Sequence, residues 1–70
     1  MNKLQAVLKK QGRSQLWLAN QLDITKSTMS TWCTNRSQPS LEKLFKVAEI
    51  LNVEVTELLE TKKRIKAKIN

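Results

Sequence analysis

The polar side chains best suited to recognising a ligand lie close together, between residues 26 and 31. They are one amine and three hydroxyls, on Lys26, Ser27, Ser30 and Thr31. On a helix they point away from an apolar face marked by Met29 and Trp32, which recur at the i, i+3 spacing. Such a polar face donates and accepts hydrogen bonds but carries only one charge.

The residues that enzymes use for catalysis are scarce. The chain has no histidine and a single cysteine, Cys33, and it lacks a G-x-S-x-G motif and a glycine-rich phosphate loop. Carboxylates form no close pair outside exposed helix faces. A structural zinc site would need about four cysteine or histidine ligands. We therefore expect neither an enzyme nor a protein that binds a metal or another cofactor.

Cys33 lies near the end of the segment that carries the polar face, so two interpretations are open. Its oxidation could gate binding, but a lone cysteine is more often an inert small side chain, and we favour the latter. No second cysteine exists to form an internal disulfide. With no secretion signal and no apolar run of about 20 residues, we expect a protein of the reducing cytoplasm without a membrane segment.

Length and composition predict one small helical domain. A chain of 70 residues has a core that stabilises it by only about 3–5 kcal/mol, so dimerisation or ligand binding is expected to add stability. Apolar residues make up 40%, and there is one glycine and one proline. This composition favours an all-α fold over a β-sandwich.

The charge distribution indicates a polyanion partner and a separate tail. Thirteen basic residues against six acidic ones give a net charge of +7. Residues 1–40 carry six basic and one acidic side chain, 41–60 two and five, and 61–70 five and none. We therefore divide the chain into a domain, 1–60, and a basic tail, 61–70. The tail could extend the last helix through Ile65 and Ile69, but we favour fraying.

Hydrophobic periodicity and capping residues predict five helices. The first covers residues 2–11 and ends at Gly12, where a left-handed backbone is favourable. Ser14 caps the second, Asp23-Ile24 forms a turn, and Thr25 or Lys26 begins the third. A loop through Pro39 precedes the fourth helix, whose apolar residues recur at 3.6-residue spacing. Glu54 and Glu57 lie in the first turn of the short fifth helix, where the helix dipole favours carboxylates.

Apolar and small residues recur at fixed offsets from Gln15. In the first segment they are Leu18, Ala19, Leu22, Ile24, Met29 and Trp32. After the run Gln38-Pro39-Ser40-Leu41 they are Leu44, Ala48, Leu51, Val53, Leu58 and Leu59. Through these residues the chain resembles, over 1–60, the Cro and repressor-type helix-turn-helix family of phage and bacterial regulators, also called XRE-like. The resemblance implies a compact five-helix, repressor-like fold whose second and third helices form the helix-turn-helix.

The resemblance also implies roles for individual residues. In this family the second helix of the motif enters the major groove while the first crosses the backbone. Carried over, the base-reading residues are Lys26, Ser27 and Thr31. The phosphate-contacting residues are Ser14, Gln15, Ser30, Asn35, Arg36 and Ser37. Lys9, Lys10 and Arg13 either add long-range attraction or form a solvated face.

Four residues of the motif affect its packing or depart from the family pattern. Ala19 lies where the two helices cross closely, so a larger side chain there should disturb their angle. Asp23 stands where the family usually has glycine, and Asp adopts the required left-handed backbone at modest cost. Leu16 and Trp17 replace residues that are usually polar. Either Trp17 packs against the first or fourth helix, which we favour, or the pair forms a patch for a partner.

Together these features predict sequence-specific binding of double-stranded DNA by a small transcriptional regulator, acting as a repressor by occlusion. One domain reads few base pairs, so we expect a homodimer on a pseudo-palindromic operator. Its interface is predicted at Val55, Leu59 and Ile65, with Ile69. Two alternatives stay open: an antitoxin or other protein-interaction module with the same fold and a toxin or other protein partner, and a tail that anchors to an anionic membrane.

Overall fold

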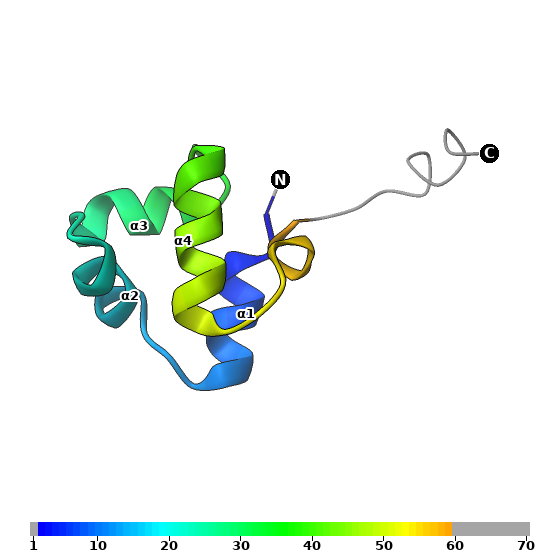
Figure 1. Cartoon of the computed structure of the whole chain (residues 1–70). Coiled ribbons are helices and arrows are strands. Elements are labelled where there is room, and N and C mark those ends of the chain that lie inside the picture. Colours follow the sequence, from blue (N-terminus) through cyan, green and yellow to red (C-terminus); the bar gives the residue numbers. More distant parts are fainter. Residues whose placement is uncertain (1, 60–70) are drawn as a thin grey trace.

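Short helices joined by tight turns account for most of the structure, a computed structural model that describes residues 2–59 (Figure 1). The elements are α1 (Leu4–Gln11), α2 (Gln15–Leu22), α3 (Lys26–Cys33), α4 (Leu41–Leu51) and a 3-10 helix, η1 (Val55–Leu58). The predicted all-α class is confirmed. None of the helices within residues 2–59 has the length and apolar character needed to cross a membrane. The tail 61–70, with Ile65 and Ile69, lies outside the described residues.

The predicted fifth helix differs from the one observed. It is a single 3-10 turn of four residues, Val55–Leu58, so four α-helices rather than five are present in residues 2–59. Glu57 stabilises its start, because the Glu54 N–H donates to Glu57 Oε2 at 3.2 Å. Leu59 already has extended backbone and pairs with Asn2 in an antiparallel bridge. This pairing takes the place of a further helical turn.

Three helices end in a left-handed residue, as their end sequences require. Gly12 closes α1 at φ 68°, and Asp23 closes α2 at φ 59°. Asn52 closes α4 at φ 57°. In each case the backbone N–H of the end residue bonds back to the last turn of its helix, which satisfies otherwise free carbonyls. The predicted left-handed conformation of Asp23 is therefore confirmed.

Hydroxyl side chains begin three of the helices. Ser14 Oγ accepts the Trp17 N–H at 3.0 Å, and Thr25 Oγ1 accepts the Thr28 N–H at 3.1 Å. Ser40 accepts in the same way at the start of α4. Each bond satisfies an amide that the helix itself leaves unpaired, and each contributes about 1 kcal/mol. Thr25 is thus the cap of α3, and Lys26 is its first residue.

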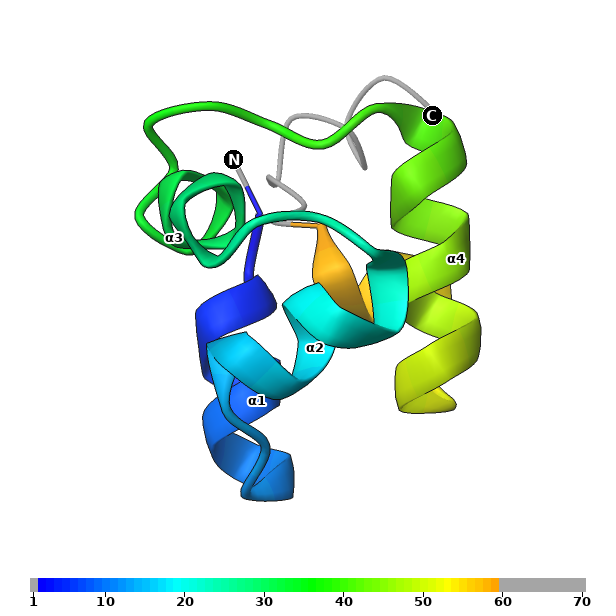
Figure 2. The same cartoon turned by 90° about the vertical axis from the view of Figure 1, so that its left-hand side faces the viewer.

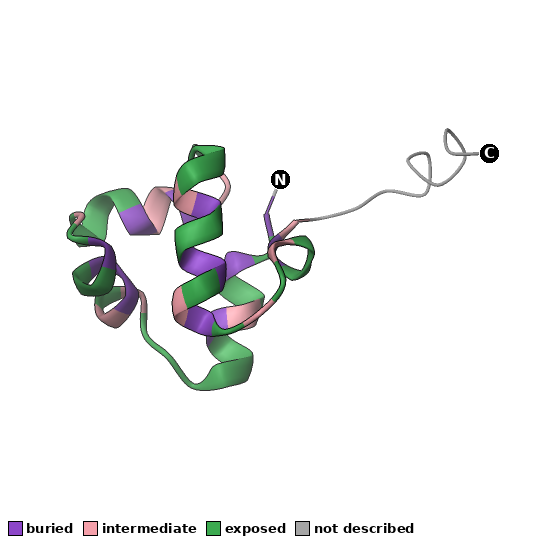
Figure 3. Cartoon of the chain, in the orientation of Figure 1, coloured by how far each residue is buried: buried purple, intermediate pink, exposed green. Residues whose placement is uncertain are grey.

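The core lies where α2 and α3 meet α1 and α4. Ala19 of α2 is 0% exposed, as are Met29 of α3 and Leu18. Figure 2 shows α3 end-on beside α2, with the loop to α4 passing over both. Buried stretches lie on the sides of the helices that face one another (Figure 3). The outward side of α3 is thereby left to solvent.

Candidate nucleic-acid interface

A tight turn fixes the angle between α2 and α3. Asp23 provides the left-handed residue, and the Ile24 N–H donates to the Ala19 carbonyl at 3.0 Å. Ile24 then packs against the core as a partly buried residue. Because Ala19 has only a methyl group, the two helices approach closely at this point. The turn therefore presents α3 with its apolar side inward.

The outward face of α3 carries the predicted reading residues. Lys26 and Ser27 are exposed, and Thr31 is half-buried. At 100° per residue Ser27 and Thr31 lie opposite the buried Met29 and Trp32, one helical turn apart. The structure therefore brings Ser27 and Thr31 to one face of α3, with Lys26 exposed at the first position of the helix.

The Thr31 hydroxyl is already engaged. It donates to the Thr28 carbonyl at 2.7 Å and lies 2.8 Å from Ser37 Oγ. With its own hydrogen bonded to the carbonyl, Thr31 accepts from Ser37. Thr28, which the sequence argument did not select, is exposed one turn before Thr31. The signal for it was present, because Thr28 and Thr31 share the i, i+3 spacing of a helical face.

At the start of α2, the two predicted phosphate-contacting residues have partners within the protein. Ser14 Oγ caps the helix but keeps its hydroxyl hydrogen for an outside acceptor. Gln15 Nε2 donates to Gln5 Oε1 of α1 at 3.0 Å. Both residues thus lie where the α2 dipole favours an anion, and Gln15 needs to exchange its bond to Gln5 to reach one.

Trp17 and Leu16 behave differently from each other. Trp17 packs against the core, and the guanidinium carbon of Arg13 lies 4.2 Å above its ring centroid. This geometry is a cation–π contact that fixes Arg13 next to the start of α2. Leu16 is 50% exposed. Trp17 thus packs within the domain, while Leu16 remains on the surface; packing against the first or fourth helix stays a prediction.

The loop after α3 is built by hydrogen bonds to the helix it leaves. The Arg36 and Ser37 N–H groups donate to the Thr31 carbonyl at 2.9 and 3.2 Å. Asn35 is left-handed at φ 62°, and its side-chain atoms bond to Asn2 and Gln38. The Asn35 side chain is therefore committed inside the protein. Of these three predicted phosphate-contacting residues, Arg36 is the exposed cation.

Charge differs between the helix-turn-helix segment and the segment that follows it. In residues 13–40 the charged side chains are three cations and one carboxylate: Arg13, Lys26, Arg36 and Asp23. The described part of the chain after residue 40 carries four carboxylates and two amines: Glu42, Glu49, Glu54, Glu57, Lys43 and Lys46. The helix-turn-helix therefore favours an anionic partner, whereas α4 and η1 do not.

Cys33 lies on the buried side of α3. Burial raises the pKa of the Cys33 thiol, because the charged thiolate is poorly solvated there. A thiol in this state is a weak nucleophile at neutral pH. The burial of Cys33 therefore favours an inert core residue over a redox switch.

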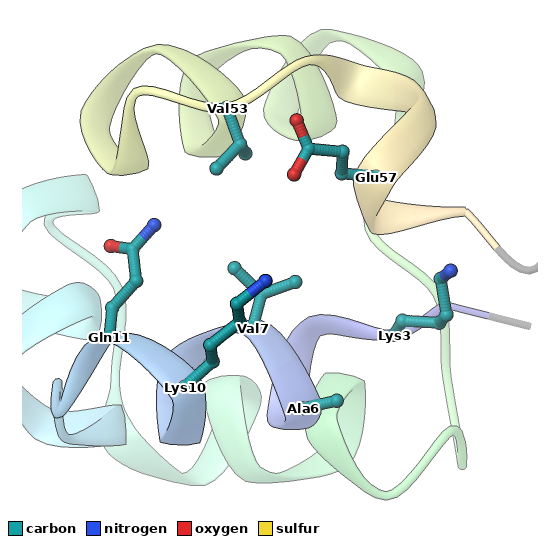
Figure 4. Close-up of a pocket in the computed structure, with 7 residues that line it drawn as sticks. All are labelled: Lys3, Ala6, Val7, Lys10, Gln11, Val53 and Glu57. Carbon is teal, nitrogen blue, oxygen red and sulfur yellow. The ribbon is translucent and has the colours of Figure 1, made fainter.

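A separate hollow of about 440 Å³ lies between α1 and η1 (Figure 4). Val7 and Val53 line it with apolar groups, and Lys10 and Glu57 line it with charged groups. None of its lining residues comes from α2 or α3. The hollow is therefore not part of the surface formed by the reading residues.

Two of the predicted dimer residues are more buried within the domain than expected. Val55 and Leu59 are half-buried and pack against the core, so each has a place within a single domain. The larger exposed apolar pair lies on α4, where Leu41 is 64% and Phe45 is 55% exposed. These two residues are one helical turn apart and share a side of α4. From the sequence both were counted on the regular apolar face of the fourth helix, not at an interface, and the structure instead leaves them exposed.

Comparisons with known proteins agree with this arrangement. A model of the helix-turn-helix family matches residues 4–58. The crystal structure of a candidate DNA-binding protein from Bacteroides fragilis is similar, with a TM-score of 0.82 and 46% sequence identity over 83% of this chain and 94% of that one. No curated protein sequence matches the chain. The fold, the turn geometry and the family match lead to one conclusion: the chain belongs to the XRE-like helix-turn-helix family.

Proposed function

We propose that the protein binds double-stranded DNA in a sequence-specific manner, with α3 as the recognition helix in the major groove. The observation that carries this proposal is the outward face of α3, where Lys26, Ser27 and Thr31 are presented by a helix-turn-helix with a net positive charge. The description of the Bacteroides fragilis protein as a candidate DNA-binding protein supports it. Lys26 donates to guanine O6 or N7, Ser27 bonds to base edges, and the Thr31 methyl contacts a thymine methyl.

Contacts to the DNA backbone set the position of the recognition helix. Arg36 supplies the charge, and Ser14 and Gln15 supply polar groups at the start of α2. Ser30 adds a hydroxyl near the reading residues, and Ser37 adds one when its hydroxyl hydrogen leaves Thr31. Asn35 contributes by holding its loop, because its side chain is bonded to Asn2 and Gln38.

The regulator acts as a repressor that occludes its operator as a homodimer. A single domain reads few base pairs, and two domains related by a two-fold axis read half-sites about 34 Å apart. The dimer surface consists of Val55 and Leu59 together with Ile65 of the tail. Leu41 and Phe45 extend it on α4, which contacts η1. Covering this pair on association removes exposed apolar surface from water.

Selection of bound sites from a random pool of duplex DNA tests the DNA-binding proposal. We expect an enriched, pseudo-palindromic sequence whose two halves are about one helical turn apart. Enrichment of a single half-site would keep sequence-specific binding but contradict the homodimer. A pool that stays random after selection would contradict sequence-specific recognition itself.

Sedimentation with and without the selected operator tests the dimer and its surface. Phe45→Ser should shift the protein toward monomer, because it removes an exposed aromatic ring from the proposed interface. Leu16→Ser is the matched control, since Leu16 has a similar exposure but lies on α2. Equal weakening by both substitutions would contradict the α4 surface, and a wild-type monomer on the operator would contradict the dimer.

Leu16 gives a specific reason to keep a second function, that of a protein-interaction module such as an antitoxin. It is a large apolar side chain at the surface of the motif. This function predicts a toxin gene next to the gene for this protein, and a complex that Leu16→Ser weakens and Phe45→Ser does not. Co-purification of the two gene products tests it.

A further inference from the structure

Asn2 is the buried polar residue of the described part of the chain. Only 6% of its surface is exposed, while the other buried side chains around it are apolar. Burying an amide is unfavourable unless all of its donors and acceptors find partners. The partners of Asn2 therefore indicate what the residue does.

The Asn2 side chain joins the end of α3 to the start of α1. Its Nδ2 donates to the Trp32 carbonyl at 3.1 Å and to Gln38 Oε1 at 2.9 Å. Its Oδ1 accepts the Leu4 N–H at 2.9 Å. Both side-chain hydrogens and the side-chain oxygen are thus used. This one amide therefore fixes the end of α3, the loop at Gln38 and the start of α1 relative to one another.

The main chain of Asn2 makes a second connection, to Asn35. The Asn2 N–H donates to Asn35 Oδ1 at 2.8 Å, and Asn35 Nδ2 donates to the Asn2 carbonyl at 3.3 Å. Gln38 Nε2 also donates to Asn35 Oδ1, at 3.0 Å. This closed network holds Asn35 by its side chain at the point where its backbone is left-handed. Left-handed backbone is unfavourable for a residue other than glycine, so it persists only where contacts hold it.

Arg36 is the residue after Asn35. Its N–H is fixed on the Thr31 carbonyl at 2.9 Å, and the Asn35 turn sets the direction in which the chain leaves the helix. The direction of the Arg36 side chain from α3 therefore depends on Asn35. We propose that Asn2 is a positioning residue that, through Asn35, aims the Arg36 guanidinium at a DNA phosphate. The inference rests on the phosphate contact of Arg36 in the proposed function.

The salt dependence of DNA binding separates this role from a merely structural one. A cation that contacts a phosphate displaces counterions, so log affinity falls as log salt concentration rises. Loss of one such cation reduces the magnitude of this negative slope by about 0.9. Asn2 and Asn35 are uncharged, so their removal changes the slope only if Arg36 leaves its phosphate. A substitution that only destabilises the fold lowers the melting temperature of that variant but leaves this slope unchanged.

The experiment measures affinity for a mixed-sequence DNA duplex over a range of salt concentrations, together with melting temperature. The single variants are Asn2→Ala, Asn35→Gly and Arg36→Ala. Two double variants combine Arg36→Ala with either Asn2→Ala or Asn35→Gly. Asn35→Gly removes the side-chain bonds that hold the turn, and glycine tolerates a left-handed backbone without being confined to it, so this variant stays informative if Asn2→Ala fails to fold. Gln11→Ala is the matched control, because its amide also bonds a distant carbonyl, that of Leu51, at 3.0 Å.

We expect Asn35→Gly to reduce the magnitude of the slope by about 0.9, as Arg36→Ala does, and the double variant of the two to reduce it no further. Asn2→Ala keeps both main-chain bonds to Asn35 but loses the side-chain bonds that hold residue 2 in place, so it should reduce the slope in the same direction by a smaller amount. Gln11→Ala should keep the wild-type slope. A wild-type slope in Asn35→Gly, with a lowered slope in Arg36→Ala, would overturn the positioning role and leave the phosphate contact intact. A wild-type slope in Arg36→Ala would overturn both.

Discussion

The hydroxyls of Thr31 and Ser37 lie 2.8 Å apart, which ties the outward face of α3 to the loop that follows it. Thr31 also donates to the Thr28 carbonyl, so its oxygen has partners within the protein. With its hydrogen used, Thr31 cannot donate to a base while these bonds persist, and its methyl and one acceptor lone pair remain. In the proposed complex Thr31 recognises a base through apolar contact of its methyl.

Replacing thymine by uracil in the selected operator tests this contact. Removing one methyl should weaken wild-type binding by about 0.8 kcal/mol, or roughly fourfold, at a single position. Thr31→Ser lacks the side-chain methyl and should bind the thymine and uracil sites equally. Thr31→Val keeps a methyl and loses the hydroxyl bonds, so it should still prefer thymine. If Thr31→Ser kept the wild-type preference at every thymine, the methyl would not be the reading group.

Lys26 and Arg36 should differ in how their loss affects DNA binding. Lys26→Ala should relax base preference at one position, with a loss of about 1–3 kcal/mol on the best site and little on others. Arg36→Ala should weaken all sequences similarly and lower the salt slope by about 0.9. Affinities for the selected operator and for single-base variants of it give both quantities. Equal losses on every sequence for both variants would contradict the division into a reading and an anchoring residue.

Ala19→Leu should strongly destabilise the domain. Ala19 is fully buried in the core, so three additional carbon atoms would have to displace packed neighbours. Overpacking of this kind costs about 1–3 kcal/mol or more, and each kcal/mol lowers the melting temperature of a domain of this size by about 4–8 °C. Thermal unfolding followed by circular dichroism measures the effect. Leu16→Ala on the exposed side of α2 is the control and should change the melting temperature little.

Asp23→Gly should raise stability slightly, and Asp23→Ala should lower it. The backbone at Asp23 is left-handed, a conformation that glycine adopts freely and alanine adopts at a cost of about 1 kcal/mol. Glycine also removes a carboxylate from the negative end of α2. Urea unfolding gives the order of the three proteins. If Asp23→Ala were more stable to urea than the wild type, the left-handed conformation of Asp23 would be contradicted.

Cys33 should react slowly with an alkylating reagent in the folded protein. Its raised pKa means that less thiolate is present at a given pH than in the unfolded chain. The neutral thiol stabilises the fold below the unfolded pKa, and this contribution is lost as the pH rises through the folded pKa. Alkylation rates measured against pH, with and without urea, should therefore show a later midpoint for the folded protein. Equal midpoints would contradict the burial of this thiol.

Much of the fold follows from local rules that the sequence displays. The ends of α1 and α2 follow from Gly12 and Asp23, because a left-handed residue is recognisable by type. The starts follow from hydroxyls such as Ser14, which bonds an amide three residues away. Met29 and Trp32 share a face by spacing alone, so the sequence also determined which side of α3 is buried and which is left to solvent.

Other features were decided only by tertiary structure. Asn2 bonds to residues 30 to 36 positions away, and no periodicity links residues so far apart in a sequence. The same network turns the Asn35 side chain inward, and the pairing of Leu59 with Asn2 replaces the predicted fifth α-helix by one 3-10 turn. The physical reason is one of range. Capping and helix periodicity act within one or two turns, whereas a buried amide takes the partners that the packed helices bring to it.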